Sequence, residues 1–359
     1  MTTAVARMPI PAPGRRLDPP VLAEPARTRA ALLRRVEDRL DTFLAGESVR
    51  WSEVDGQART PIDAIRVLTA AGGKRIRPLF CISGYLAAGG DATEESIVDA
   101  STAWELLHAC ALIHDDVMDE SAVRRRLPTV HVRHAQEHRE RGWLGEPERY
   151  GESVALLAGD LALVYADNFM AAAGPVVRDI WNEARVELIV GQFMDTAVAV
   201  RGRPDVRLAR WIAGCKSGRY TIERPLALGA TLAGHAQLDT AFARYGTPLG
   251  EAFQLRDDLL DITGDAAVIG KPTSADLERH KMTLLMSLAM ARDARIREAV
   301  HAGLPLHDLL IESGMCAAVE HRIERLVGEA CAAIEHAPLD AWWRRELGEM
   351  ALQVAYRVK

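Results

Sequence analysis

Apolar residues recur three and four positions apart from Arg29 onward, within long segments rich in Ala, Leu, Arg and Glu. This spacing matches one face of an α-helix, which has about 3.6 residues per turn. The two-residue alternation expected of strands is confined to short pieces such as Thr196 to Val200. The pattern therefore predicts an all-α protein whose helices are broken where Gly, Pro and Asp cluster.

The chain divides into a tail and one domain. Residues 1–28 are rich in Pro, Ala and Arg and lack an apolar period, so we expect them to be disordered. Residues 29–359 are expected to form a single helical domain, because no break resembles a long linker and no repeat of solenoid length occurs. The charged stretch from Arg133 to Glu152 contains Gly and Pro, and we expect it to be an exposed excursion of that domain.

Composition narrows the function classes. The chain has 359 residues, 44 Lys and Arg against 50 Asp and Glu, a formal charge of −6 and 48% hydrophobic residues. This balance is typical of a soluble globular protein and lacks the basic excess of a dedicated nucleic-acid binder. The richest apolar stretch, Ser153 to Val177, is interrupted by Asp160 and Asp167, so no membrane span is expected. No phosphate-binding glycine loop of the Rossmann or P-loop type is present.

Cysteine usage and the N-terminal residues bear on the compartment. The five cysteines are widely spaced and include no CxxC pair, which indicates reduced thiols rather than disulfides or a zinc site. Several prolines stand where a signal peptide would need its apolar helix. We therefore expect a cytoplasmic protein.

Two segments of the chain share the pattern Asp-Asp-x-x-Asp within apolar surroundings. The first begins at Asp115 and ends at Asp119, and the second begins at Asp257 and ends at Asp261. On a helix, residues four apart project from one face about one turn apart, so each motif is a carboxylate cluster. Carboxylates so close together repel one another, and the neighbouring leucines add a desolvation cost. Such a cluster is therefore unfavourable unless cations are bound.

A single motif of this kind is more simply explained as a solvated acidic helix face. Two copies set between apolar residues instead favour a metal site. Magnesium prefers oxygen ligands and binds one or two carboxylates together with phosphate oxygens. Two clusters facing one cavity would suit several Mg²⁺ ions holding a diphosphate.

Basic residues near these motifs indicate an anionic ligand. The segment Gly72 to Pro78 combines two glycines with Lys74, Arg75 and Arg77, and Arg124 to Arg126 follow the first aspartate motif. The first segment could be a solvated basic turn, but the run of three arginines without acidic neighbours indicates an anion.

With these motifs, the sequence resembles the polyprenyl synthetase family, the trans-isoprenyl diphosphate synthases, over roughly residues 30 to 357. The resemblance rests on an ordered set of signatures: Gly72 to Pro78, His108 to Asp119 with Arg124-Arg125 and Pro128 to His131, Gly159-Asp160, Gln192 with Asp195, Lys216, Phe253-Gln254 with Asp257 to Asp261, and Gly270-Lys271 through Asp276 to Lys281. It implies a helical bundle of the isoprenoid synthase type around a central cavity. The implied activity is Mg²⁺-dependent condensation of isopentenyl diphosphate with an allylic diphosphate.

The resemblance also implies roles for individual residues. Isopentenyl diphosphate would be held by Lys74, Arg77, His108 and Arg125. The allylic diphosphate would be held by Arg124, Lys216, Ser217, Gln254, Lys271 and Lys281. Three Mg²⁺ ions would be bound by Asp115, Asp116, Asp119, Asp257, Asp258 and Asp261, and the catalytic step would depend most on Asp115, Asp119, Lys216 and Asp257. A homodimer is the family expectation.

Departures from the family pattern include Ser217 for the usual Thr and Arg126 for the usual Gly, and none removes a metal ligand or a required cation. Two other functions remain open. A class I terpene cyclase would share the fold, but the intact second aspartate motif and the intact Gly72 to Pro78 segment argue against it. A catalytically silent partner subunit would be expected to lose one of the clusters.

Product length should follow from the depth of the cavity below the first cluster. Ala111 and Cys110 lie four and five residues before Asp115 and are small, so a growing chain would pass them. Trp104 lies roughly 16 Å lower on nearly the same helix face, from about 1.5 Å and 100° per residue. We expect Trp104 to block the end of this path, which would limit the product to geranylgeranyl diphosphate; a farnesyl or longer product stays open. Trp104 could equally be an ordinary core residue. Tyr165 and Phe169 are alternative residues for the end of the path.

Overall fold

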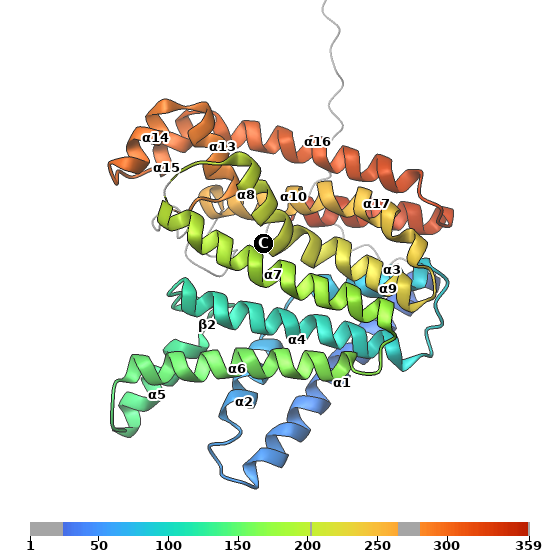
Figure 1. Cartoon of the computed structure of the whole chain (residues 1–359), viewed down its shortest axis with the longest axis vertical. Coiled ribbons are helices and arrows are strands. Elements are labelled where there is room, and N and C mark those ends of the chain that lie inside the picture. Colours follow the sequence, from blue (N-terminus) through green and yellow to red (C-terminus); the bar gives the residue numbers. More distant parts are fainter. Residues whose placement is uncertain (1–23, 202, 265–280, 358–359) are drawn as a thin grey trace, which may run out of the picture.

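The computed structural model describes residues 24–201, 203–264 and 281–357. Its first half consists of seven helices and one two-stranded hairpin (Figure 1). These elements are α1 (Glu24–Ser52), α2 (Thr60–Ala70), α3 (Ile76–Ala87), α4 (Glu95–Met118), β1 (Val123–Arg124), β2 (Leu127–Pro128), α5 (Val130–Arg141), α6 (Pro147–Met170) and α7 (Pro175–Arg201).

The second half is also helical and includes one π-helix, η1, and one short 3₁₀ turn, η2. Its elements are α8 (Val206–Ala213), η1 (Gly214–Glu223), α9 (Arg224–Leu232), η2 (Ala236–Leu238), α10 (Asp239–Thr263), α13 (Leu284–Arg292), α14 (Ala294–His301), α15 (His307–Glu312), α16 (Met315–Glu335) and α17 (Ala341–Ala355). The predicted all-α class is thus confirmed.

Helix α4 is the central helix of the first half. It is buried around most of its circumference, with Trp104, Leu106 and Ile113 all inaccessible to solvent. A helix that is apolar on every side must be surrounded by other elements. α6, α3 and α1 pack against it, and α4 lies between α7 and α6 in the view of Figure 1.

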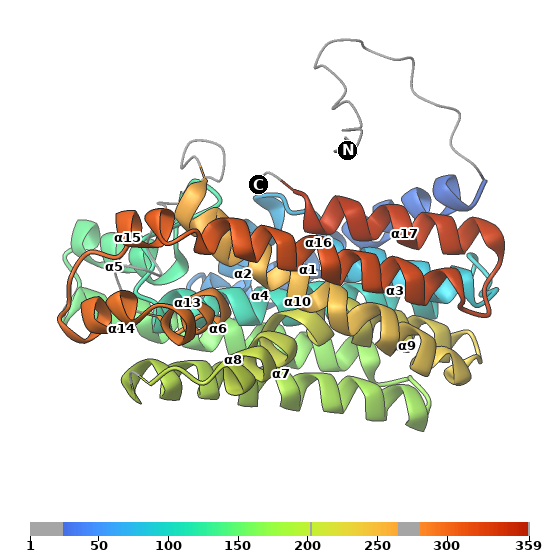
Figure 2. The ribbon, with the colours of Figure 1, turned by 90° about the horizontal axis from the view of Figure 1, so that it is seen from above.

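Two hydrophobic cores meet along α3, η1 and α9. One core joins α4 to α1, α2, α6 and most of α7, and the other joins α10 to α13, α16 and α17. Tyr220 of η1 belongs to the first core and Ile222 to the second. Figure 2 shows the resulting layers, with α16 and α17 on one side of α10 and α7 on the other. The carboxyl ends of α4 and α10 are thereby held in one framework.

The structure corrects three sequence-based expectations. Helix α1 begins at Glu24, inside the stretch assigned to the tail, while residues 1–23 lie outside the described residues. Thr196 to Val200 are helical because they complete α7. The excursion expected from Arg133 to Glu152 is mostly α5 and the start of α6, which pack on each other and bury His134 and His138.

Close helix crossings depend on glycine. A Cβ atom on Gly229 of α9 would lie 2.0 Å from the carbonyl oxygen of Cys81 in α3, and one on Gly218 of η1 would lie 2.9 Å from the Cα of Gly250 in α10. Both contacts are with backbone, which cannot move aside as a side chain can.

We predict that Gly229→Ala lowers the free energy of unfolding by about 1–3 kcal/mol, because the added methyl group forces α3 and α9 apart. Urea denaturation measures this change. The matched control is Gly46→Ala in α1, where an added Cβ meets nothing within 4 Å. That control should stabilise the protein by about 0.5–1 kcal/mol, and an equal loss in both variants would contradict the packing argument.

Candidate active site

The first aspartate cluster lies at the carboxyl end of α4, and each of its members is paired with a cation or an amide. Asp115 accepts from Lys216 Nζ at 3.1 Å and from Gln192 Nε2 at 3.0 Å. Asp116 accepts from Arg124 Nε at 2.7 Å, and Asp119 pairs with Lys281. These partners come from η1, α7, the β1–β2 hairpin and the segment before α13.

Burial and charge set the protonation of this cluster. Burial raises the pKa of Asp116 to about 6, although Arg124 opposes the rise. Burial and the neighbouring Asp115 likewise raise the pKa of Asp119. Burial acts in the same direction on Asp115, but Lys216, Lys281 and Arg124 outweigh it and hold the pKa of Asp115 below its usual value.

Lys216 connects the cluster to α7. Its Nζ donates to Asp195 at 2.9 Å as well as to Asp115. Burial would lower the pKa of Lys216, but the two aspartates outweigh burial and raise it, so the ammonium stays charged. Lys216 and the following Ser217 lie in the π-helix η1, a geometry that often marks functional sites.

The second cluster lies near the carboxyl end of α10. Asp258 accepts from Gln254 Nε2 at 2.6 Å and from the backbone N–H of Leu285 at 3.1 Å. Asp257 pairs with Arg357, whose guanidinium also lies 3.7 Å from the centre of the Phe253 ring. Asp261 is buried.

One short segment bridges the two clusters. Lys281 contacts Asp119 of the first cluster, and the backbone of Leu285 contacts Asp258 of the second. Four residues of fully extended chain span at most about 14 Å. The two clusters are therefore tied to one short segment and lie near each other.

The residues present fit a hard divalent metal. All six members are carboxylates, and both clusters lie at helix carboxyl ends, where the helix dipole already carries negative partial charge. Among the described residues, no group of three acidic, histidine or cysteine side chains converges closely enough to hold a metal ion alone. Phosphate oxygens would then supply the remaining ligands, as Mg²⁺ commonly requires.

The basic residues predicted to bind isopentenyl diphosphate gather around His108. Arg77 lies with its guanidinium 4.2 Å from the centre of the Tyr220 ring, and Arg125 donates from Nη1 to the carbonyl oxygen of Leu68 at 3.0 Å. A Cβ on Gly73 would lie 2.8 Å from Arg125 Nη2, so the glycine makes room for that guanidinium. Lys74 is exposed in the same loop.

Burial, followed by the positive charges of Arg77, Arg125, Arg124 and Arg75, lowers the pKa of His108 well below its usual value. The Nδ1 atom of His108 and the Nε atom of Arg77 are buried without a hydrogen-bond partner among the described residues. So much uncompensated positive charge around a neutral imidazole suits an anion. Arg75 and Arg124 are the exceptions, because Arg75 pairs with Glu105 and donates to the Thr69 carbonyl oxygen, and Arg124 pairs with Asp116.

The hairpin places consecutive arginines in the two sites. Arg125 and Arg126 have φ values of 51° and 64°, the conformation of the central residues of a type I′ turn. Glycine, the usual residue at position 126 in the family, adopts this conformation without strain. Arg124 consequently reaches Asp116 while Arg125 turns toward Gly73.

Trp104 is fully buried and belongs to an aromatic group. Its ring centre lies 5.1 Å from that of Trp181 in α7 and 6.0 Å from that of Tyr220. Cys110 is buried and Ala111 half-buried, with burial raising the pKa of the Cys110 thiol to about 12.

The rival floor residues contact a different element. The rings of Tyr165 and Phe169 each lie with their centres 4.9 Å from that of Phe43 in α1. Of the proposed floors, Trp104 is thus the one in ring contact with α7 and η1.

Three further residues bear on the site. Lys271 lies outside the described residues. The sequence gives no signal for Arg357 or Tyr220, because each makes its contacts across space and neither lies within a charged motif. A lone arginine near the carboxyl terminus gives no local signal of its partner on α10.

Known proteins of similar sequence identify the family of this chain. A geranylgeranyl diphosphate synthase from Cyanophora paradoxa is 35% identical over 234 residues, which are 62% of this chain and 72% of that protein. A (2E,6E)-farnesyl diphosphate synthase from Mycobacterium tuberculosis is 34% identical over 269 residues, 72% of this chain and 67% of that protein.

Among solved structures, geranylgeranyl pyrophosphate synthase from Corynebacterium glutamicum, complexed with isoprenyl diphosphate and magnesium, has a TM-score of 0.84 and 35% identity. The alignment covers 93% of this chain and 98% of that one. The fold is therefore that of the all-helical isoprenyl synthases. The family model for polyprenyl synthetase matches residues 61–304, and the chain belongs to this family. It is accordingly a trans-prenyltransferase.

The lowered pKa of His108 predicts a dependence of stability on pH. The unfolded chain takes up a proton on this imidazole near pH 6.5, whereas the folded protein does so only at lower pH. Stability is therefore lost as pH falls below about 6.5, at up to about 1.4 kcal/mol per pH unit for this one group. His108→Gln should flatten the slope of unfolding free energy between pH 7 and 5.

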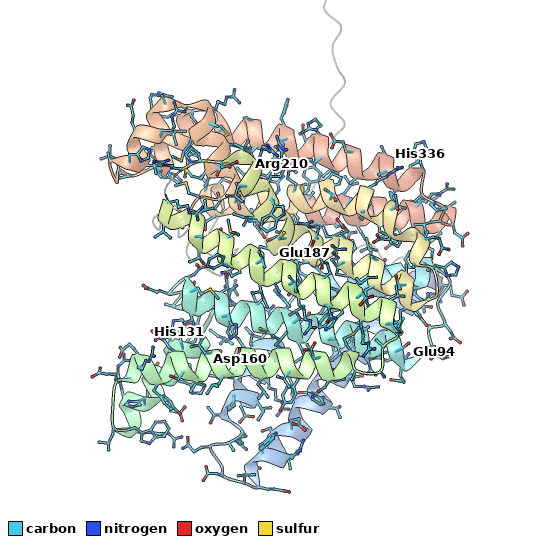
Figure 3. All side chains as sticks on the ribbon, in the orientation of Figure 1. Glu94, His131, Asp160, Glu187, Arg210 and His336 are labelled. Carbon is cyan, nitrogen blue, oxygen red and sulfur yellow. The ribbon has the colours of Figure 1, made fainter. Side chains whose placement is uncertain are left out.

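The matched control is His336→Gln at the exposed end of α16, which Figure 3 labels. It should leave the slope unchanged. Identical slopes for the wild type and His108→Gln would contradict the inferred environment of His108.

Proposed function

We propose that this protein condenses isopentenyl diphosphate with an allylic diphosphate to give a trans-prenyl diphosphate, with geranylgeranyl diphosphate as the main product. The observation that carries the proposal is the juxtaposition of two charged groups that could each bind a diphosphate. One is the pair of bridged carboxylate clusters, and the other is the group of arginines around His108. Consecutive residues Arg124 and Arg125 join them.

The carboxylate clusters would bind the allylic diphosphate through Mg²⁺, and we propose three ions held by the six aspartates. When bound, the metal would stabilise negative charge on the departing diphosphate. Lys216, Lys281 and Arg124 already point at the same carboxylates and would offset that charge from the protein side. Lys271 is proposed for the same role from its sequence position.

The second substrate would be positioned by Arg77, Arg125, Lys74 and the neutral His108. These residues would hold the diphosphate of isopentenyl diphosphate so that its double bond faces the allylic carbon. Departure of the allylic diphosphate leaves an allylic cation, the double bond attacks it, and a proton lost to the released diphosphate completes the product. No side-chain nucleophile is needed.

Product length follows from the residues below Asp115. Cys110 and Ala111 are small enough to be passed, and Trp104 is fully buried three turns below the metal ligands. A path of roughly 16 Å, from about 1.5 Å per residue, suits three to four isoprene units. A relative named as a geranylgeranyl diphosphate synthase supports this length, and one named as a geranylfarnesyl diphosphate synthase keeps a longer product as an alternative. A farnesyl diphosphate synthase relative keeps the shorter product as the alternative.

The proposal is tested by incubating the purified protein with labelled isopentenyl diphosphate, Mg²⁺ and dimethylallyl, geranyl or farnesyl diphosphate in turn. The products are dephosphorylated and separated by chromatography. A C20 alcohol as the main product is expected from every starter. A cyclic hydrocarbon, or no product from any starter, would overturn the proposal.

We predict that Asp115→Asn lowers kcat by about 10²–10³-fold, since it removes one of the groups that stabilise the departing charge. Steady-state turnover at saturating Mg²⁺ measures the loss. Asp99→Asn is the matched control on the same helix, because Asp99 pairs with Arg39 of α1 far from the cluster. Equal activity in the two variants would argue against a metal-binding role for Asp115.

We also propose that two copies of the chain associate through α6 and α7. Apolar side chains line the outward faces of both helices, and large exposed patches of this kind mark interfaces. They include Leu157, Val164, Val186, Ile189 and Phe193, each between 53% and 67% accessible. α6 is the one described helix long and apolar enough to span a membrane, but 44% of its apolar window is buried inside the molecule. A second copy would cover the remainder.

Sedimentation velocity at micromolar concentration should therefore show a dimer. Leu157→Glu with Phe193→Glu should give a monomer, because burying two carboxylates opposes association. Val67→Glu, on an exposed position of α2, should leave the dimer intact. A monomeric wild-type protein would contradict the proposed interface.

A cytoplasmic location is proposed on the cysteines, all five of which are free thiols. Reducing compartments keep such thiols unpaired.

A further inference from the structure

A surface cavity of about 400 Å³ lies where α6 ends and α7 begins. Its apolar lining comes from Met170, Ala171, Pro175 and Trp181, and its polar lining from Asp167, Arg178, Asp179, Asn182 and Arg185. This volume falls within the range of pockets that hold small organic ligands. The long stems of Arg178 and Arg185 give its wall apolar surface despite their charged heads.

Trp181 forms the inner wall of this cavity. Its side chain is only 2% exposed, and its indole Nε1 donates to Asp167 Oδ1 at 2.8 Å. Arg185 pairs with the other oxygen of Asp167, and its guanidinium lies 5.5 Å from the centre of the Trp181 ring. The indole is therefore held in place by a hydrogen bond and a stacked cation.

The opposite side of Trp181 faces the interior. Its ring meets that of Trp104 edge-on, at 5.1 Å between centres and 81° between planes. Trp104 in turn lies on the α4 face that leads up to Asp115. One indole thus separates the residue proposed as the product floor from a cavity open to the surface.

We propose that Trp181 is a specificity-determining residue that closes the far end of the product path together with Trp104, and that the outer cavity receives a longer prenyl chain once Trp181 is made small. This inference rests on the proposed function. Its physical basis is that replacing a buried indole by a methyl group leaves a large apolar void, which the surrounding helices fill only in part. The void would join the path beside Trp104 to the existing cavity.

The test compares the chain lengths made by the wild type, Trp181→Ala and Trp104→Ala from farnesyl diphosphate and isopentenyl diphosphate. Both variants should shift the main product from C20 to C25 or longer, with at least a several-fold rise in the fraction of longer chains. Trp181→Phe, which keeps an aromatic ring, should retain C20.

A second substitution distinguishes the cavity from general loosening of the fold. Ala171 lines the cavity and is exposed, so Ala171→Trp should fill it. Trp181→Ala with Ala171→Trp should return the product toward C20, whereas Ala171→Trp alone should leave the product unchanged. Persistence of long products in the double variant would show that the chain does not enter the cavity and would overturn the proposal.

Trp343→Ala is the control for loss of a buried indole elsewhere, because Trp343 is 5% exposed in α17 and belongs to the other core. It should lower stability and leave the product at C20. If Trp181→Ala does not fold, Trp181→Leu supplies the comparison with a smaller cavity and should still lengthen the product.

An unchanged C20 product from folded Trp181→Ala or Trp181→Leu would overturn the inference and leave the proposed function intact. Absence of any condensation product from the wild type would instead overturn the proposed function, and this inference with it.

Discussion

Negative charge concentrated at the carboxyl ends of two buried helices governs the arrangement of this site. Asp116, Asp258 and Asp261 are almost inaccessible to solvent, and the helix dipoles of α4 and α10 add to their negative potential. Removing one partner from a buried ion pair costs about 3–5 kcal/mol. Cations must therefore accompany these carboxylates, and the fold supplies them from elements that are distant in the sequence.

The origin of those cations explains how the site is assembled. Lys216 comes from η1, Arg124 from the β1–β2 hairpin, Lys281 from the segment before α13, and Arg357 from the carboxyl terminus. Each ion pair ties one of these elements to α4 or α10. Under the proposed function, the same cations would be available to diphosphate oxygens once metal ions neutralised the carboxylates. The same Lys and Arg side chains would thus stabilise the fold and bind the substrate.

Local sequence patterns predicted those features that depend on residues within the same helix. The three- and four-residue spacing identified the helices, and the four-residue spacing of Asp115 and Asp119 placed both on one face. Contacts across space were not predictable in this way. Arg357 and Trp181 lie in no recognisable motif, and the π-helix around Lys216 arises where η1 packs against α10 through Gly218 and Gly250. Thr196 to Val200 looked strand-like, but the length of α7 overrode that short alternation.

The central claim is that the two aspartate clusters act together on one diphosphate. A double-mutant cycle tests it most directly, by measuring the affinity of a non-reactive allylic diphosphate analogue in Mg²⁺ for the wild type, Asp119→Asn, Asp257→Asn and the double variant. We expect each single variant to weaken binding and the double variant to lose far less than the sum, with a coupling energy of about 0.5–3 kcal/mol. Strictly additive losses would mean that the clusters act independently and would contradict the account.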